Sequence, residues 1–130
     1  MIPIIGLLVG LILGIILPVN VPRTMSLYLS IALLACLDSV FGGIRASLEN
    51  KFDTDIFISG FFGNAILAAG LTYLGDRLNV PIYYAAIVVF GGRLFQNFAV
   101  MRREIIENIR RKKGIKNSNV VKSGGEDDEI

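Results

Sequence analysis

Residues Ile82 to Met101 read IYYAAIVVFGGRLFQNFAVM, and this stretch decides the fold class. Its length is that of a helix crossing a bilayer, about 17–25 mostly apolar residues. Arg93 interrupts the segment near its middle, and Gln96 and Asn97 follow about one turn later. A mid-membrane charge costs about 2.5–3.5 kcal/mol, while each large apolar residue returns only about 0.3–0.6 kcal/mol. We therefore expect this helix to insert stably only beside a helix that neutralises Arg93.

The rest of the chain supports a membrane protein. It has 130 residues, of which 53% are hydrophobic, and a mean hydropathy of +0.62. A soluble domain of this size buries only about 60–70% of its chain surface, too little to hide so much apolar area. We predict an all-α bundle of four transmembrane helices within a domain covering residues 1–113. The expected spans are residues 2–17, 25–46, 56–74 and 82–101.

The ends of the chain carry three further expectations. The first apolar segment lacks a basic start and a cleavage site, so we expect it to be retained rather than removed as a signal peptide. Residues 102–113 are predicted to continue the last helix as a basic amphipathic extension. Residues 114–130 turn polar and acidic and are predicted to be disordered. A three-span bundle, with the first segment peripheral or absent, is the alternative.

Lys and Arg are concentrated after the last span. Eight of the 13 Lys and Arg residues follow Met101, and such residues near helix ends mark the cytoplasmic side. The C-terminus is therefore predicted to be cytoplasmic, and four spans place the N-terminus there too. The loop carrying Lys51 falls on the same side, while Arg23 and Arg77 fall outside. Three spans would place the N-terminal end outside.

Composition also limits the chemistry. The chain contains no histidine and one cysteine, Cys36, which excludes disulfide frameworks, Cys/His metal sites and His-dependent catalytic triads. No Walker A, dinucleotide, nucleophile-elbow or HExxH motif occurs. The carboxylates that could act as acids or bases are needed for charge pairing. We therefore expect no cofactor, no metal and no enzymatic activity.

Glycines occur where helices are expected to pack closely. Gly6, Gly10 and Gly14 form a tandem G-x-x-x-G, which favours packing against other helices of the same chain. A homodimer seam is the alternative for this stripe. The pairs Gly42-Gly43 and Gly91-Gly92 are expected to let the second and fourth helices approach each other.

Polar residues are expected at matching depths in the bundle. Asp38 and Asn64 lie near the middle of the second and third spans, and Arg93 near the middle of the fourth. The second and fourth spans run in the same direction, so we predict an Asp38–Arg93 ion pair supported by Asn64 and Gln96. With Asn97 these residues form the predicted intramembrane polar cluster. We interpret it as an assembly lock, and a conduction pathway is the alternative.

The remaining basic residues are assigned to the membrane surface. Arg45, near the cytoplasmic end of its helix, is expected to snorkel to the interface. The basic extension is expected to contact anionic lipids, at about 1 kcal/mol per residue, or an acidic partner. Its candidate contact residues are Arg102, Arg103, Arg110, Arg111, Lys112 and Lys113. Nucleic-acid binding is not expected without a folded reader domain.

Three motifs carry a family resemblance. LDSVFGGIRASLE begins at Leu37, FISGFFGNAILA at Phe57 and FGGRLFQNFAVMRR at Phe90. In this order and spacing the chain resembles the bacterial small basic protein family over about residues 1–113. The resemblance implies a small multi-pass protein of the bacterial plasma membrane without an established activity. It also implies a link to cell division, because genes of the family often lie in division and cell-wall clusters.

From these observations we predict a non-enzymatic membrane scaffold or accessory subunit. Its expected partners are the lipid bilayer and another membrane protein, with homo-oligomerisation as an open alternative. A small oligomeric transporter or channel, using the polar cluster as its pathway, is the second functional prediction. Four short helices leave little room for a substrate cavity, so transport would require assembly of several copies.

Overall fold

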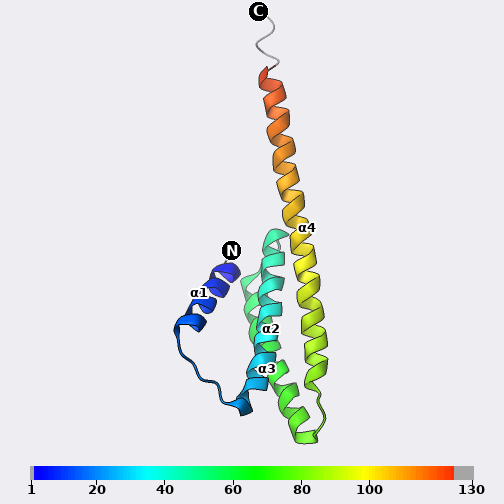
Figure 1. Ribbon diagram of the computed structural model, residues 1–130. Coiled ribbons are helices and arrows are strands. Elements are labelled where there is room, and N and C mark those ends of the chain that lie inside the picture. Colours follow the sequence, from blue (N-terminus) through cyan, green and yellow to red (C-terminus); the bar gives the residue numbers. More distant parts are fainter. Residues whose placement is uncertain (1, 125–130) are drawn as a thin grey trace, which may run out of the picture.

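The computed structural model describes residues 2–124, with side chains as far as Val120. These residues form four helices: α1 (Ile2–Ile16), α2 (Arg23–Leu48), α3 (Thr54–Leu78) and α4 (Tyr83–Gly124). The prediction of an all-α chain with four helices is confirmed. Figure 1 shows α2, α3 and the first half of α4 side by side, with α1 leaning away from them.

Helix length separates α1 from the others. Three helices, α2, α3 and α4, are long and apolar enough to cross a membrane. The 15 residues of α1 span only about 22 Å at 1.5 Å per residue, against about 30 Å for the hydrocarbon core of a bilayer. By length and composition the described residues therefore contain three candidate spans, not the four expected from the sequence.

Local chemistry explains where α3 begins and ends. The Asp53 side chain accepts hydrogen bonds from the backbone N–H groups of Asp55 and Ile56, at 2.9 and 3.0 Å, and so caps the first turn. At the other end Asn79 adopts a left-handed conformation with φ of 51°, a common way to stop a helix. A Cβ on Gly75 would lie 2.6 Å from the Val80 carbonyl oxygen. Glycine is needed there because the chain folds back tightly toward α4.

The packed core is small and sits toward the end of the bundle where α3 turns into α4. It is built from Ile31 and Ala35 of α2, Ala68 of α3, and Ala86 and Phe90 of α4. Alanine allows close backbone approach, which is how helices associate in membranes. Many large apolar side chains point outward, including Ile66 and Phe95 (71% and 75% exposed). Such a surface fits a bilayer better than water.

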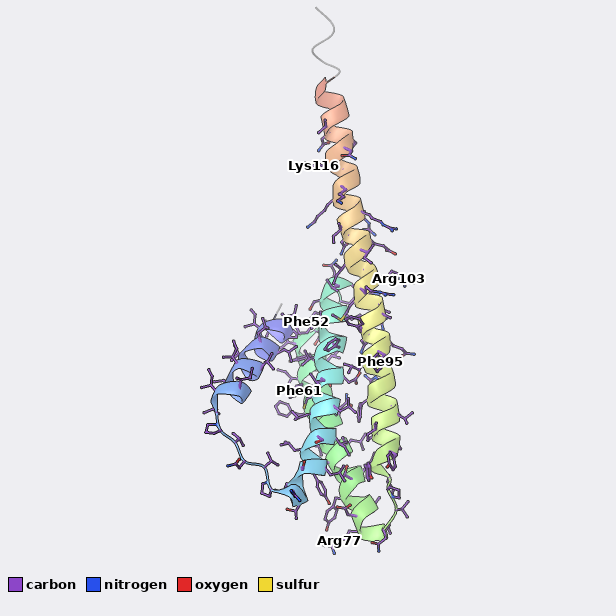
Figure 2. The ribbon with its side chains drawn as sticks, in the orientation of Figure 1. Phe52, Phe61, Arg77, Phe95, Arg103 and Lys116 are labelled. Atoms are coloured by element: carbon purple, nitrogen blue, oxygen red, sulfur yellow. The ribbon has the colours of Figure 1, made fainter. Side chains whose placement is uncertain are left out.

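The last helix is longer than expected. It runs unbroken to Gly124, where the sequence predicted a disordered tail from residue 114; residues 125–130 of that tail lie outside the described residues. This segment contains no proline, and Gly114 costs a helix only about 1 kcal/mol. Figure 2 shows Arg103 where α4 leaves the bundle and Lys116 well beyond it. The extension stands alone as a single helix.

The N-terminal end of α1, the α2–α3 connection and the exit of α4 lie at one end of the bundle (Figure 1). Pro3 of α1 is buried there and lines a small cavity with Ile44 and Leu48 near the end of α2. Figure 2 shows Phe52 at this end and Arg77 at the opposite one. We call the end that carries Phe52 and the α2–α3 connection the loop end.

Candidate functional site

The central contact joins α2 to α4. Asp38 is completely buried, and its Oδ2 atom lies 3.3 Å from Nη2 of Arg93, whose side chain is half exposed. The two residues with matching depth and opposite charge in the sequence are thus an ion pair in the structure. The pair is asymmetric, because the carboxylate has no exposed surface while the guanidinium is half exposed.

Asn97, one turn after Arg93, extends this contact. Its Nδ2 donates to the Oδ1 atom of Asp38 at 3.4 Å, and its Oδ1 accepts from Nη1 of Arg45 at 3.4 Å. Asn97 is buried (8% exposed). Gly42 lies beside it, where a Cβ would be in ordinary contact, 3.6 Å from Nδ2 of Asn97. A single asparagine thereby connects two ionic groups of α2.

Arg45 completes the series. Its Nε lies 2.9 Å from Oε1 of Glu49 at the end of α2, and this contact holds the pKa of the Glu49 carboxyl below its usual value. We call Arg93, Asp38, Asn97, Arg45 and Glu49 the polar ladder. Arg45 was expected to snorkel to the interface, and in the structure it also links the buried pair to the loop end. The signal available in the sequence was its place seven residues after Asp38, on the same helix face.

The two supports predicted for the ion pair lie elsewhere. Asn64 donates from Nδ2 to Oγ of Ser39 at 3.2 Å, and Ser39 in turn donates to the Ala35 carbonyl at 3.1 Å. Asn64 therefore ties α3 to α2 through Ser39 rather than through a hydrogen bond to the pair. Gln96 is exposed and makes no hydrogen bond within residues 2–120. Ser39 and Glu49 are members of this site that the sequence analysis did not predict.

The predicted glycine contacts are only partly present. A Cβ on Gly43 would lie 2.8 Å from Cδ2 of Phe57 on α3 and 3.3 Å from Cγ of Pro3 on α1. The absence of a side chain at Gly43 thus makes room for Phe57 of α3 and Pro3 of α1, whereas the sequence predicted α4 there. A Cβ would meet no atom of the described chain within 4 Å at Gly6, Gly10, Gly14, Gly91 or Gly92. The glycine stripe of α1 is therefore not in close packing with the helices of its own chain.

Two cavities flank α2 at this level. A polar cleft of about 210 Å³ lies between α2 and α3 and contains both Asp38 and Arg93. An apolar cavity of about 600 Å³ separates α1 from α2 and α3, with Gly6, Gly10 and Cys36 in its wall. One face of α2 thus borders the polar cleft, and another face borders the apolar cavity.

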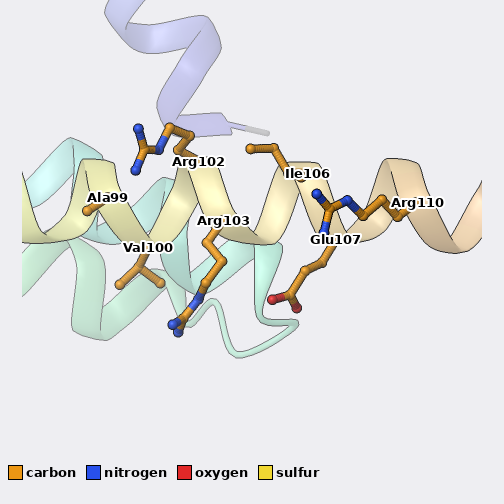
Figure 3. Close-up of a pocket in the computed structure, with 7 residues that line it drawn as sticks. All are labelled: Ala99, Val100, Arg102, Arg103, Ile106, Glu107 and Arg110. Atoms are coloured by element: carbon orange, nitrogen blue, oxygen red, sulfur yellow. The ribbon is translucent and has the colours of Figure 1, made fainter.

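A shallow, open groove runs along one face of α4 where it leaves the bundle, and residues of this helix alone line it. Figure 3 shows its lining along successive turns: Ala99, Val100, Arg102, Arg103, Ile106, Glu107 and Arg110. The six basic residues assigned to a lipid or partner contact are all exposed on this part of α4. The structure leaves them free of the bundle.

Two further observations concern polar side chains outside the polar ladder. At the end opposite the loop end, the Tyr28 hydroxyl donates to Asp76 and joins α2 to α3. Among residues 2–124, no group of three or more His, Cys, Asp or Glu side chains is placed to hold a metal ion. The chemistry that this arrangement offers is charge pairing and hydrogen bonding between helices.

Comparison with known proteins places the chain in a narrow group. A family model described as "Protein of unknown function (DUF1290)" matches residues 21–106. The chain is 46% identical over 105 residues to the "Small basic protein" of Bacillus subtilis, covering 81% of this chain and 87% of that one. It is 48% identical over 80 residues to uncharacterized proteins of Mycobacterium tuberculosis and Mycobacterium bovis, covering 60% of this chain and 66% of each. No solved structure matches. The family match contains the whole polar ladder.

Proposed function

This chain belongs to the DUF1290 family of small basic proteins, and from that premise we propose that it is a non-enzymatic integral membrane protein that binds another membrane protein. The setting we propose is bacterial cell division or envelope assembly, which rests on the family resemblance alone. The other parts of the proposal rest on the surfaces that the fold leaves uncovered.

Four crossings of the bacterial plasma membrane form part of the proposal. The start of α1 lies at the loop end, whereas α2 starts at the opposite end (Figure 1). The 15 residues of α1 supply about 22 Å, and the six residues 17–22 can supply up to about 20 Å more. Together they are long enough to cross. The basic α4 extension supports a cytoplasmic loop end, with both termini on that side.

One observation carries the binding role: the α4 extension leaves the bundle as a lone helix with exposed apolar residues. Ile105, Ile106 and Ile109 are 45%, 43% and 50% exposed beside a groove rich in arginine. A single helix without tertiary contacts is marginal in water, so a helix of this kind gains most from a partner surface. We propose that this partner is a membrane protein with an acidic, partly apolar cytoplasmic face, and that anionic lipids add to the attraction.

A small oligomeric channel or transporter is the second candidate, and the polar cleft that reaches Asp38 favours it. The packing beyond Asp38 weighs against it. On the side away from the loop end, Ile31, Ala35 and Ala68 belong to a packed core. A pathway through one chain would have to pass this core, so conduction would need an interface between copies.

Site-directed photocrosslinking in native membranes tests the binding role. We would place a benzophenone amino acid at Ile106, in the α4 groove, and at Ile66 as a control facing the bilayer. We expect Ile106 to give one stoichiometric adduct with a different membrane protein and Ile66 to give none. If Ile106 yields only adducts between copies of this chain, the scaffold proposal fails and the oligomeric channel replaces it.

A further inference from the structure

The polar cleft between α2 and α3 has six polar or charged residues in its wall, among apolar ones. Its wall includes Asp38, Ser39, Lys51, Asp53, Asn64 and Arg93. Lys51 and Asp53 belong to the α2–α3 connection, so the cleft begins at the loop end. The other four lie deeper, on three different helices.

The depth of this cleft follows from the helix geometry. Asp38 lies ten residues before the end of α2 at Leu48, and Asn64 lies ten residues after the start of α3 at Thr54. At 1.5 Å per residue, both are about 15 Å from the loop end of their helices. That distance is half the thickness of a bilayer hydrocarbon core, about 30 Å. The cleft therefore reaches the level of the membrane midplane.

Asp38 gives the cleft its second, independent feature. Its side chain is completely buried, and its Oδ2 atom accepts no hydrogen bond from the described residues. The 3.3 Å approach of Arg93 supplies charge but not a hydrogen bond to that atom. A buried carboxylate oxygen of this kind favours a hydrogen-bond donor. The cleft volume of about 210 Å³ leaves room for several water molecules.

The cleft is closed at its inner end. Ala35, one turn beyond Asp38 on α2, is completely buried, as is Ala68, one turn beyond Asn64 on α3. Ile31 and Phe90 extend the same packed core. Water entering at the loop end would reach the polar ladder and stop there.

We propose that this cleft is an aqueous site: a column of water enters between α2 and α3 at the loop end, hydrates Asp38 and Arg93 at the membrane midplane, and ends there. The proposal rests on the membrane location proposed above. It explains how a buried ion pair is tolerated at that depth without complete pairing inside the protein. It also assigns a ligand class to the cleft, namely water and solutes small enough to follow it.

The reactivity of cysteines placed on α3 tests the proposal. Gly60 faces the polar cleft, whereas its neighbours Ile58 and Phe62 face the apolar cavity. Gly60 lines the polar cleft, and a Cβ there would meet no described atom within 4 Å. Ile58 and Phe62, two residues shallower and two deeper, line the apolar cavity instead. Cysteines at these three positions, in a Cys36→Ala background, distinguish an effect of the helix face on the labelling rate from an effect of depth in the membrane. The full chain in lipid nanodiscs presents both bilayer surfaces, so the result does not depend on topology.

The probe is a small trimethylammonium methanethiosulfonate, and the thiols left unmodified are then counted by a gel shift in SDS. The thiolate is the reactive species and is suppressed in apolar surroundings by about tenfold per unit of pKa. We expect Gly60→Cys to react at least about tenfold faster than Ile58→Cys and Phe62→Cys. Ser39→Cys, at the cleft floor, should likewise exceed the native Cys36 of the wild-type chain, which lines the apolar cavity.

The outcomes separate the two proposals. Rates that are slow at all three α3 positions, or that fall steadily with depth, overturn the aqueous cleft. A slow Ser39→Cys also overturns it, because water would then not reach Asp38. If that variant does not accumulate, Gly42→Cys on the same wall decides. Ile58 and Phe62 are 48% and 60% exposed in the protein alone, so fast labelling of both would instead overturn the membrane location.

Discussion

Removing one partner of the Asp38–Arg93 pair should destabilise the bundle by an amount that depends on which partner is lost. Arg93→Leu leaves Asp38 as an unpaired carboxylate inside the bundle. Breaking a buried pair costs about 3–5 kcal/mol, and water in the proposed cleft would hold the loss to the lower end of that range. Taking up a proton limits the penalty, since protonating an ordinary aspartate at pH 7 costs about 4 kcal/mol. Asp38→Leu leaves a half-exposed guanidinium, which can hydrate, so we expect about 1–3 kcal/mol.

The double variant, Asp38→Leu with Arg93→Leu, should lose clearly less than the sum of the two single losses. Apolar replacement of both partners removes the unpaired charge, and such replacements are often neutral. The assay is equilibrium unfolding of the four proteins in mixed detergent micelles, analysed as a double-mutant cycle. Gln96→Leu, on the same helix but exposed, is the matched control and should change stability by less than about 0.5 kcal/mol. Strict additivity of the single losses, or an equal loss at Gln96, would refute the pairing argument.

Three further predictions address packing, topology and transport. Gly43→Ala should destabilise the bundle by about 1–3 kcal/mol in the same unfolding assay, because its Cβ would lie 2.8 Å from the Phe57 ring. Gly91→Ala, which meets no described atom within 4 Å, is the control and should stabilise the bundle by up to about 1 kcal/mol, because alanine favours a helix over glycine. Reporter fusions before Met1 and after Lys113 should both report a cytoplasmic location, and an external N-terminus would remove the fourth crossing. Purified protein in liposomes should pass no ions or small solutes above background, and reproducible flux would replace the scaffold proposal with the channel.

The sequence was sufficient to predict the helices and the central ion pair for a definite physical reason. Spans of fixed length place residues at calculable depths, and an aspartate and an arginine at one depth have few other partners in hydrocarbon. Depth does not specify rotation about the helix axis. Gln96 and Asn97 are neighbours in sequence and about 100° apart around α4. Only the packed structure decides that Asn97 faces α2 and Gln96 faces outward.

The other differences have similar causes. Glycine spacing showed where close packing is permitted, but not which helix occupies the space, so Gly43 receives Phe57 of α3 rather than α4. The polar composition after Lys113 suggested disorder, although it contains no helix-breaking proline, and α4 continues through it to Gly124. The position of α1 could not be derived either. The sequence offered its glycine stripe as the packing face, but a Cβ at Gly6, Gly10 or Gly14 would meet no described atom within 4 Å.

The unbroken course of α4 makes it a lever arm. From Arg93, held at Asp38, to Gly124 the helix rises about 46 Å at 1.5 Å per residue. A change of about 10° in the tilt of α4 about Arg93 moves the far end of the helix by about 8 Å, several times the displacement of any group near the ion pair. A partner bound at the end of the helix would therefore be displaced by small changes in the tilt of α4 against the bundle. Force applied at the tip would act, in the opposite direction, on the Asp38–Arg93 contact.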